Sequence, residues 1–233
     1  MTTSLIPSLR KRGTPTTLLT VAALASLLGI GNMTAAADGG RSELPVILGA
    51  GAGWGLLWTV VAAAVAPRLR RSAATRRAWY DVPVLLALTA MTMQAGAGLV
   101  QHLMFGSAEP YLALQQSEAA EGSLIFFLVL NPLTEWVFMP LALYLNWRSA
   151  GRRRFLLAAA AAYYAERAVT YLYFAPTVVG WKDEPVTTRL LDEVSFWLAA
   201  DWLRLAVIAG IITALALAVV RRRPGRAGAT ATA

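Results

Sequence analysis

The sequence predicts an all-α integral membrane protein, a bundle of six transmembrane helices with both ends of the chain on the cytoplasmic side. Hydrophobic residues make up 57% of the 233 residues, charged residues only 15%, and the mean hydropathy is +0.54. A soluble domain carries about 25% charged residues, so this chain has too few to cover a soluble surface. The apolar residues lie in continuous runs, whereas the strands of a membrane barrel alternate between apolar and polar residues.

Six apolar segments have the length of membrane spans, because a hydrocarbon core about 30 Å thick needs roughly 20 helical residues. In chain order they are 16–34, 45–66, 82–105, 123–145, 155–176 and 196–220. Arg189 and Glu193, four residues apart, predict that the last helix already begins near Thr187. We therefore expect one transmembrane domain at 16–220, between a basic cytoplasmic N-terminus at 1–15 and a disordered, basic cytoplasmic tail at 221–233.

Arginine and lysine predict the orientation, because short cytoplasmic links carry an excess of these residues. Sixteen of the 21 lysines and arginines lie in four places, at 10–12, 68–77, 148–154 and 221–226. With six spans, all four places lie on the same side of the membrane. Insertion and attraction to anionic headgroups then explain the net charge of +8, and we expect no nucleic-acid partner.

Aromatic residues mark both predicted membrane boundaries as an interfacial belt. They are Trp79, Tyr80, Tyr144 and Trp147 on the inner side and Tyr111, Trp181 and Phe196 on the outer side.

The first segment has a second interpretation. Its most apolar part, 18–31, follows a basic stretch and precedes a run of alanines at 35–37, which is typical of a cleaved signal peptide. We expect a retained helix, because the whole segment can span with little tilt. Cleavage would leave five spans and the same charge pattern.

Five ionisable side chains lie inside the predicted spans, although each costs several kcal/mol at the centre of a bilayer. They are Glu135, Glu166, Arg167, Asp201 and Arg204. From the direction of each helix, at about 1.5 Å per residue, we place Glu135 and Glu166 near the midplane and the others farther outward. The inner halves of the spans are almost purely aliphatic. We therefore expect a polar pocket in the outer half, bounded by the third to sixth spans.

Glu135 is the strongest candidate for a catalytic group. No basic residue lies within one turn of it on its own helix, and a carboxyl group without a nearby cation tends to keep its proton inside a membrane. Such a group is ready to act as a general acid. Asn131, one turn away, is placed to orient it, and Pro132 and Pro140 free backbone carbonyls at the two ends of this turn.

Glu166 and Asp201 are the other catalytic candidates, as groups that accept a proton or stabilise a developing cation. Residues predicted to contact the substrate are Gln94, Gln101, His102, Asn131, Arg167, Thr170, Tyr171, Trp197 and Arg204. Neighbours in a helix point in different directions, so Glu166 and Arg167 are expected to find partners on other helices. Asp201 and Arg204, three residues apart, can form a local ion pair. The alternative interpretation is that these charges only lock the helices together.

Composition and motifs exclude several functional classes. The chain has no cysteine and a single histidine, which excludes disulfides, iron–sulfur clusters, thiolate metal sites and bis-histidine haem. A metal site of Glu135, Glu166 and His102 is disfavoured because their depths differ, so we expect no metal and no cofactor. The Walker A, GxGxxG, HExxH and GxSxG motifs are absent, and ATP-driven transport would therefore need a partner chain.

Glycine-rich helix faces allow close packing within the chain or in a homodimer. They are formed by Gly49, Gly51, Gly53, Gly55, Gly96 and Gly98. Because Gly98 shares a helical stripe with Gln94, it could instead leave room for a ligand.

These features favour a multi-pass enzyme of the cell membrane that performs acid–base chemistry, of the isomerase or cyclase (lyase) type, on a lipophilic substrate, with an isoprenoid as one candidate. In general kind, a small helical membrane protein with buried carboxylates and aromatic residues resembles the membrane-bound terpene cyclases, a resemblance that assigns no residue roles. The expected partners are membrane lipids and the lipophilic substrate. A small proton- or cation-coupled transporter or permease subunit is the second hypothesis, and a non-catalytic membrane subunit is the third. A sealed apolar inner half favours the first or the third, because a transporter should carry polar groups along the inner path.

Overall fold

The computed structural model describes residues 44–75 and 77–221, and every regular element in this part of the chain is a helix. The elements are α2 (Leu44–Thr75), the 3₁₀ turn η2 (Arg77–Tyr80), α3 (Val82–Met104), α4 (Ala108–Gln115), α5 (Ala119–Pro132), the π-helical turn η3 (Leu133–Phe138), α6 (Met139–Asn146), α7 (Ala150–Val169), the π-helical turn η4 (Thr170–Phe174), α8 (Ala175–Gly180) and α9 (Thr188–Val220). The all-α class is confirmed for these residues. The predicted N-terminus at 1–15, the first span and the tail from residue 222 lie outside them.

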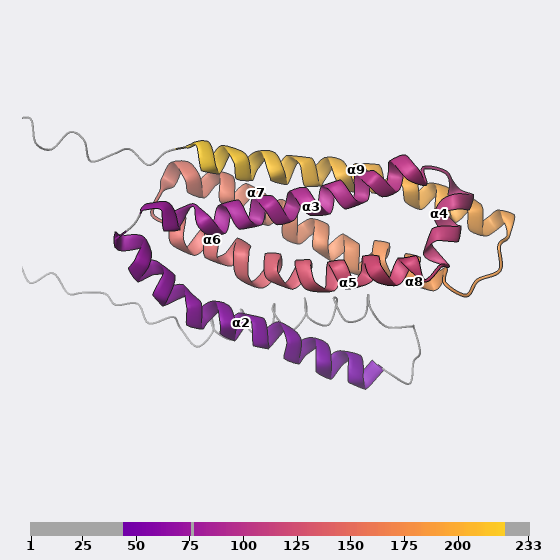
Figure 1. Ribbon diagram of the computed structural model, residues 1–233, viewed down its shortest axis with the longest axis horizontal. Helices are drawn as coiled ribbons and strands as arrows, with labels where there is room; N and C mark the ends of the chain where they lie inside the picture. The colour runs from indigo at the N-terminus through magenta and orange to yellow at the C-terminus, as the bar shows by residue number, and fades with distance from the viewer. Residues whose placement is uncertain (1–43, 76, 222–233) are drawn as a thin grey trace, which may run out of the picture.

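Each of the other five predicted segments corresponds to one continuous helical run. Three of the runs are α2, α3 and α9, and the other two are α5–η3–α6 and α7–η4–α8, in which the elements follow one another without a break. The stretches that are long and apolar enough to cross a membrane are Ala50–Ser72, Ala78–Met104 and Thr188–Val220. Apart from α2, which crosses the others obliquely, the runs lie lengthwise beside one another (Figure 1).

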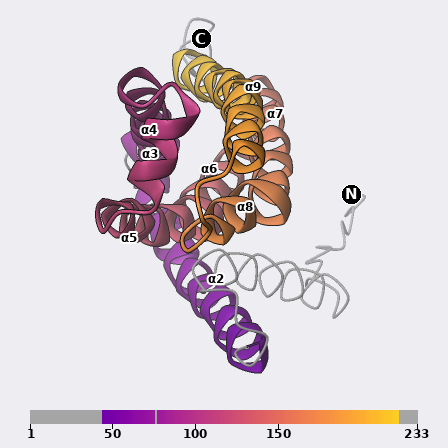
Figure 2. The ribbon, with the colours of Figure 1, turned by 90° about the vertical axis from the view of Figure 1, so that its right-hand side faces the viewer.

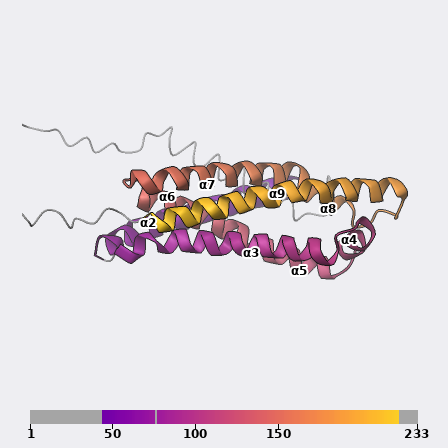
Figure 3. The same cartoon turned by 90° about the horizontal axis from the view of Figure 1, so that it is seen from above.

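Helix α9 lies between α7 and α3 and packs against both (Figure 3). Helix α6 and the turn η3 contact α3 as well, and α6 also contacts α7. The end-on view shows α3 and α5 on one side of the bundle and α7 and α9 on the other (Figure 2). Helix α2 contacts η3 and α6 from outside this group. The four runs that carry the predicted polar residues therefore face a common interior.

Gly98 lets α3 and α9 approach closely. A Cβ atom at this position would lie 2.9 Å from Leu205 Cδ2, whereas a Cβ at Gly96 would meet nothing within 4 Å. The space beside Gly98 is thus filled by a leucine side chain of α9. Gly98 therefore serves helix packing and does not leave room for a ligand.

Two apolar clusters hold the bundle together. One joins α3, α6, α7 and α9 and includes Met91, Met139, Tyr163 and Ile208, all fully buried. The other lies where α4, α8 and the start of α9 meet (Figure 1), and half of its buried residues are aromatic, so we name it the aromatic cluster. Its members include Tyr111, Phe174, Trp181 and Trp197.

The belt prediction is wrong for two of the outer residues. Tyr111 and Trp181 are only 3% and 2% exposed, because their rings pack edge to face, 6.4 Å apart, inside the aromatic cluster. Phe196, in contrast, is 66% exposed. Tyr111 lies on α4, a short helix that the sequence pattern does not predict. Packing against other rings of the chain removes these two side chains from the surface.

The last helix begins where the charge spacing predicts. Thr187 caps α9 by accepting a hydrogen bond from the Leu190 N–H at 3.2 Å. Gln116, which follows α4, donates to the carbonyl oxygens of Trp181 and Glu184 at 2.8 and 2.9 Å. These bonds fix the loop between α8 and α9 over the aromatic cluster.

Candidate functional site

The two π-helical turns of the chain's described part carry three of the predicted site residues, Glu135, Thr170 and Tyr171. In η3 the Met139 N–H bonds to the Thr134 carbonyl, and in η4 the Ala175 N–H bonds to the Thr170 carbonyl. Each bond spans five residues instead of the four of an α-helix. Such single π turns inside α-helices are rare and occur frequently at functional sites.

A proline follows each π turn and removes the next backbone donor. In the five-residue register, the Glu135 carbonyl would accept from residue 140, which is Pro140, and the Tyr171 carbonyl would accept from residue 176, which is Pro176. Proline has no N–H to donate. The Tyr164 hydroxyl takes over at the first position and donates to the Glu135 carbonyl oxygen at 2.6 Å.

The side chains at these two positions bind each other. The Tyr171 hydroxyl donates to Oε1 of Glu135, so the two π turns meet in one hydrogen bond between antiparallel neighbouring runs. Glu135 is 1% exposed. Its second oxygen, Oε2, is buried and has no hydrogen-bond partner among the described residues. One oxygen of the carboxyl group is therefore held by Tyr171, and the other has no partner within the described ranges.

Several other buried polar atoms, on α3, α5, η3 and α7, also have no partner in the described part of the chain. They are both amide atoms of Gln94, Oδ1 of Asn131, Nε1 of Trp136 and the hydroxyl of Tyr163. Tyr163 interacts electrostatically with Glu135 and belongs to the same apolar cluster as Met139 and Met91. Met91 lies one helical turn from Gln94 on α3. A native interior usually pairs such atoms, so this group of atoms has unused hydrogen-bonding capacity.

Glu166 and Arg167 bind each other directly, although the helical spacing predicts that their side chains point apart, and the predicted partner on another helix is confirmed for Glu166, which pairs with Arg204 of α9. Arg167 donates from Nε and from a terminal nitrogen to the two Glu166 oxygens, at 2.6 and 2.8 Å. The arginine side chain is long enough to fold back across one residue. Thr170 donates to Oε1 of Glu166 at 2.8 Å, and Arg204 of α9 reaches the same oxygen at 3.5 Å.

Asp201 extends this network to a third helix. Arg204 donates to its Oδ1, as the predicted local ion pair requires. His102 of α3 lies 2.7 Å from its Oδ2, and the imidazole ring packs on Trp202 with 4.6 Å between the ring centroids. We name the set His102, Asp201, Arg204, Glu166, Arg167 and Thr170 the ionic network. Asp201 and His102 are 2% and 6% exposed.

Two predicted site residues lie apart from these groups. Trp197 donates from its indole N–H to the Phe174 carbonyl at 3.2 Å and packs among the rings of the aromatic cluster. Gln101 is half-buried next to His102 in sequence and is not part of the ionic network. The structure thus brings Glu135 together with Tyr171, and Glu166 and Asp201 together with Arg167, Thr170, Arg204 and His102.

Tyr164 shares a helical stripe with Arg167 and Tyr171 in the sequence, but the predicted set of site residues does not include it. A signal for the two π turns is nonetheless present, because the segments 134–140 (TEWVFMP) and 170–176 (TYLYFAP) share Thr, Phe and Pro at the same spacing. The first residue of each segment, Thr134 or Thr170, supplies the carbonyl that accepts the π-helical hydrogen bond, and the last residue is the proline. This match is too short to stand out as a repeat without the structure.

Within residues 44–75 and 77–221, no three His, Asp or Glu side chains gather in a group that could hold a metal ion.

Comparison of this chain with protein-family models, with curated proteins and with solved structures finds no match.

Proposed function

We propose that this protein is a multi-pass enzyme of the cell membrane that performs acid–base isomerase or cyclase chemistry on a lipophilic substrate held within the helical bundle. In this proposal the chain crosses the membrane six times, with both termini in the cytoplasm. Glu135 is the acid, and the ionic network supplies the proton acceptor.

Surface character supports the membrane part of the proposal. Large aliphatic side chains point outward from several helices, with exposed fractions of 73% for Leu103, 83% for Leu172 and 71% for Leu203. Such residues suit contact with lipid tails. The runs α5–η3–α6 and α7–η4–α8 are both longer than the roughly 20 residues that a span needs, so they are proposed as spans beside the three apolar helices.

The free Oε2 of Glu135 is the observation that carries the catalytic part. If Glu135 served only to hold helices together, both of its oxygens would be paired, because a buried polar atom without a partner costs about 1–3 kcal/mol. Tyr171 instead occupies Oε1 alone. The unpaired Oε2 is then the atom that carries the proton and presents it to a substrate.

The remaining groups have roles that suit a carbocation formed when Glu135 protonates a carbon–carbon double bond. The Tyr163 ring lies 5.6 Å from the Arg167 guanidinium, which illustrates that its face can accommodate a cation. The Glu166 and Asp201 carboxylates together balance the charges of Arg167 and Arg204, so the site does not repel a developing positive charge. Asp201, bonded to His102, accepts the proton that the substrate loses.

An isotope experiment tests this proposal even while the substrate is unidentified. Purified full-length protein in lipid nanodiscs is incubated with a lipid extract in D₂O, and mass spectrometry follows deuterium that enters carbon positions. Glu135→Gln should lower incorporation by about 10²–10⁴-fold and leave thermal unfolding unchanged, while Glu135→Asp should be partly active. Glu184→Gln, at an exposed carboxylate of the loop before α9, is the matched control and should remain fully active.

Two results would contradict the proposal. One is incorporation by Glu135→Gln at the wild-type rate, which would remove this carboxyl from the chemistry. The other is an extract that stays chemically unchanged while vesicles take up a solute in a Glu135-dependent and pH-dependent manner, which would favour the transporter hypothesis.

A further inference from the structure

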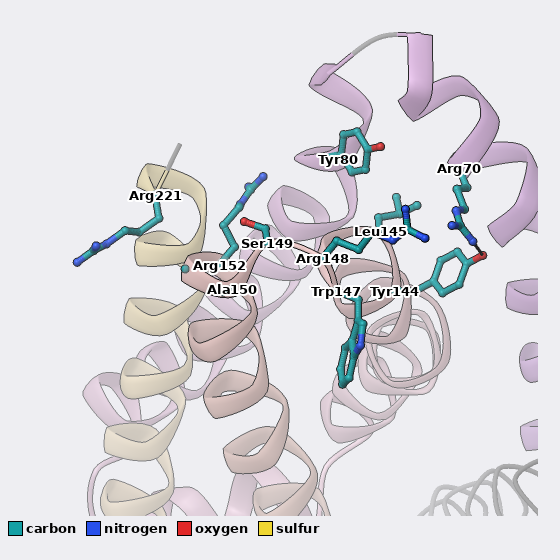
Figure 4. Close-up of a pocket in the computed structure, with 11 residues that line it drawn as sticks. Arg70, Tyr80, Tyr144, Leu145, Trp147, Arg148, Ser149, Ala150, Arg152 and Arg221 are labelled. Carbon is teal, nitrogen blue, oxygen red and sulfur yellow. Dashed lines mark hydrogen bonds between the residues drawn. The ribbon is translucent and has the colours of Figure 1, made fainter. Parts of the chain in front are cut away.

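A pocket of about 960 Å³ lies at the end of the bundle where α6 passes into α7, away from Glu135 and the ionic network. Its lining comes from the ends of α2 and α9, from the α6–α7 turn and from Tyr80 of η2 (Figure 4). Four of the lining residues are arginines, and none of the described lining residues is a carboxylate. They are Arg70, Arg148, Arg152 and Arg221.

One of these arginines is structural. Arg152 is 4% exposed and forms an ion pair with Asp81 at 2.5 Å, and its Nε donates to the Ala218 carbonyl at 2.7 Å. Arg70, Arg148 and Arg221 are exposed, and none of them has a carboxylate partner among the described residues. Arg70 bonds only to the neutral Tyr144 hydroxyl, at 3.2 Å. Three guanidinium groups therefore have no counter-charge among residues 44–75 and 77–221.

The first turn of α7 adds to the positive potential of the pocket. Ser149 is the N-cap residue, but its hydroxyl makes no capping bond, and the turn contains no acidic side chain. The first intrahelical bond runs from the Arg153 N–H to the Ser149 carbonyl, so the N–H groups of residues 150–152 have no acceptor within the helix. Helix N-termini normally attract negative charge, whereas this one begins with the arginines at 152–154.

We infer that this pocket binds a phosphate-bearing anion. Guanidinium groups bind phosphate oxygens through paired hydrogen bonds, and free helix N–H groups bind them as well. The pocket is large enough for the headgroup and glycerol of a phospholipid, and its aromatic rim, with Tyr144 and Trp147 45% and 52% exposed, suits the headgroup region. The phosphate is supplied by an anionic lipid or by a soluble diphosphate, and both sources use the same chemistry.

The test uses purified full-length protein in a neutral detergent and three probes. Dioctanoyl phosphatidic acid presents the phosphate on a lipid, dioctanoylglycerol presents the same tails without it, and inorganic diphosphate presents the anion alone. Binding is measured by calorimetry at low salt. We expect phosphatidic acid to bind and dioctanoylglycerol not to bind. Saturation by diphosphate, with displacement of the lipid, would support the site and assign it to a soluble ligand.

Paired variants assign the binding to the pocket. An arginine near an anionic lipid surface contributes a factor of about five in affinity, so Arg70→Gln/Arg148→Gln should bind phosphatidic acid about 25-fold more weakly. Arg68→Gln/Arg154→Gln removes two exposed arginines from the same end of the bundle that do not line the pocket, and it should bind within about twofold of wild type.

Three outcomes overturn the inference. They are equal weakening in both double variants, which would mean diffuse surface attraction, equal binding of dioctanoylglycerol, and no binding of either phosphate probe. If the first double variant does not fold, Arg148→Gln alone replaces it, since Arg148 is exposed, and a fivefold loss is then expected. The readout is binding, so it stands apart from the proposed catalysis at Glu135.

Discussion

The ionic network and the Glu135–Tyr171 pair lie in the same interior, yet they differ in how completely their hydrogen bonds are made. In the ionic network, Glu166 accepts bonds from Arg167, Thr170 and Arg204, and Asp201 is bonded through both oxygens. In the pair, one Glu135 oxygen is bonded and the other has no partner in the described part of the chain. The carboxyl groups of both are therefore buried and differ in hydrogen-bond satisfaction, and in the proposed function the unpaired Oε2 of Glu135 is the atom that meets the substrate.

This difference predicts opposite responses to mutation. Removal of a member of the ionic network leaves a partner charge buried and unpaired, so stability should fall. Glu135→Gln removes the transferable proton and leaves no unpaired charge behind, so stability should stay unchanged while activity falls.

The largest expected effect is on the stability of the ionic network. Arg167 is 1% exposed, and Arg167→Ala should lower the free energy of unfolding by about 3–5 kcal/mol, because Glu166 would lose the cation that donates to both of its oxygens. Arg204→Ala should cost less, since 15% of its side chain is exposed. Thermal unfolding in detergent measures both. A wild-type melting temperature for Arg167→Ala, combined with lost turnover, would place that residue in the chemistry instead.

A smaller effect is expected at the bond that joins the two π turns. Tyr171→Phe removes the donor to Oε1 of Glu135 and leaves a buried carboxyl with no partner in the described residues, at a cost of about 1–3 kcal/mol. The carboxyl group would also lose its orientation, so deuterium incorporation should fall. Tyr173→Phe, at a half-buried tyrosine of the same turn, is the control. Unchanged incorporation in Tyr171→Phe would show that the pair does not position the acid.

The sequence alone predicts much of this arrangement, and the reasons for its failures are local. Continuous apolar runs are sufficient to locate five helical runs, and the rarity of charge inside a membrane is sufficient to select Glu135, Glu166, Arg167 and Asp201, all of which are buried. The prediction from helical spacing treats neighbouring side chains as pointing apart. It fails for Glu166 and Arg167, because the Arg167 side chain is long enough to reach back to its neighbour.

The π turns are harder to predict, because they change the register of the helix at the residues that matter. The spacing of an α-helix gives no indication that Glu135 and Tyr171 both sit where a proline removes the backbone donor. The Thr, Phe and Pro shared by 134–140 and 170–176 are visible in the sequence, but only the structure shows that these segments are antiparallel neighbours.

Helices α3 and α9 pack closely at Gly98, beside the ionic network, and this contact can be tested separately from the charges. Gly98→Ala would place a methyl group 2.9 Å from Leu205 Cδ2, which is too close. The same methyl group would lie 3.9 Å from an Arg204 nitrogen, which is an ordinary van der Waals distance. Leu205 would have to move, at a cost of about 1–3 kcal/mol. Gly96→Ala meets nothing within 4 Å and should be neutral or stabilising. Equal melting temperatures for the two variants would mean that α3 and α9 separate easily at this level.

The smallest effect on stability is expected at Pro140, and this variant tests whether the π turn itself matters. Pro140→Ala restores a backbone N–H that can reach the Glu135 carbonyl, which now accepts from the Tyr164 hydroxyl, or can close an α-helical bond to Trp136. Replacement of a proline gives the unfolded chain more conformational entropy, which lowers the free energy of unfolding by less than about 1 kcal/mol. The melting temperature should therefore change little. The regained donor removes the reason for the five-residue register, and the Glu135 side chain should turn away from Tyr171. Deuterium incorporation should therefore fall in Pro140→Ala, and Pro67→Ala, at an exposed proline inside α2, should leave it unchanged. If Pro140→Ala retains full incorporation, the π turn follows from packing alone, and the contrast between the two buried groups depends only on which oxygens are paired.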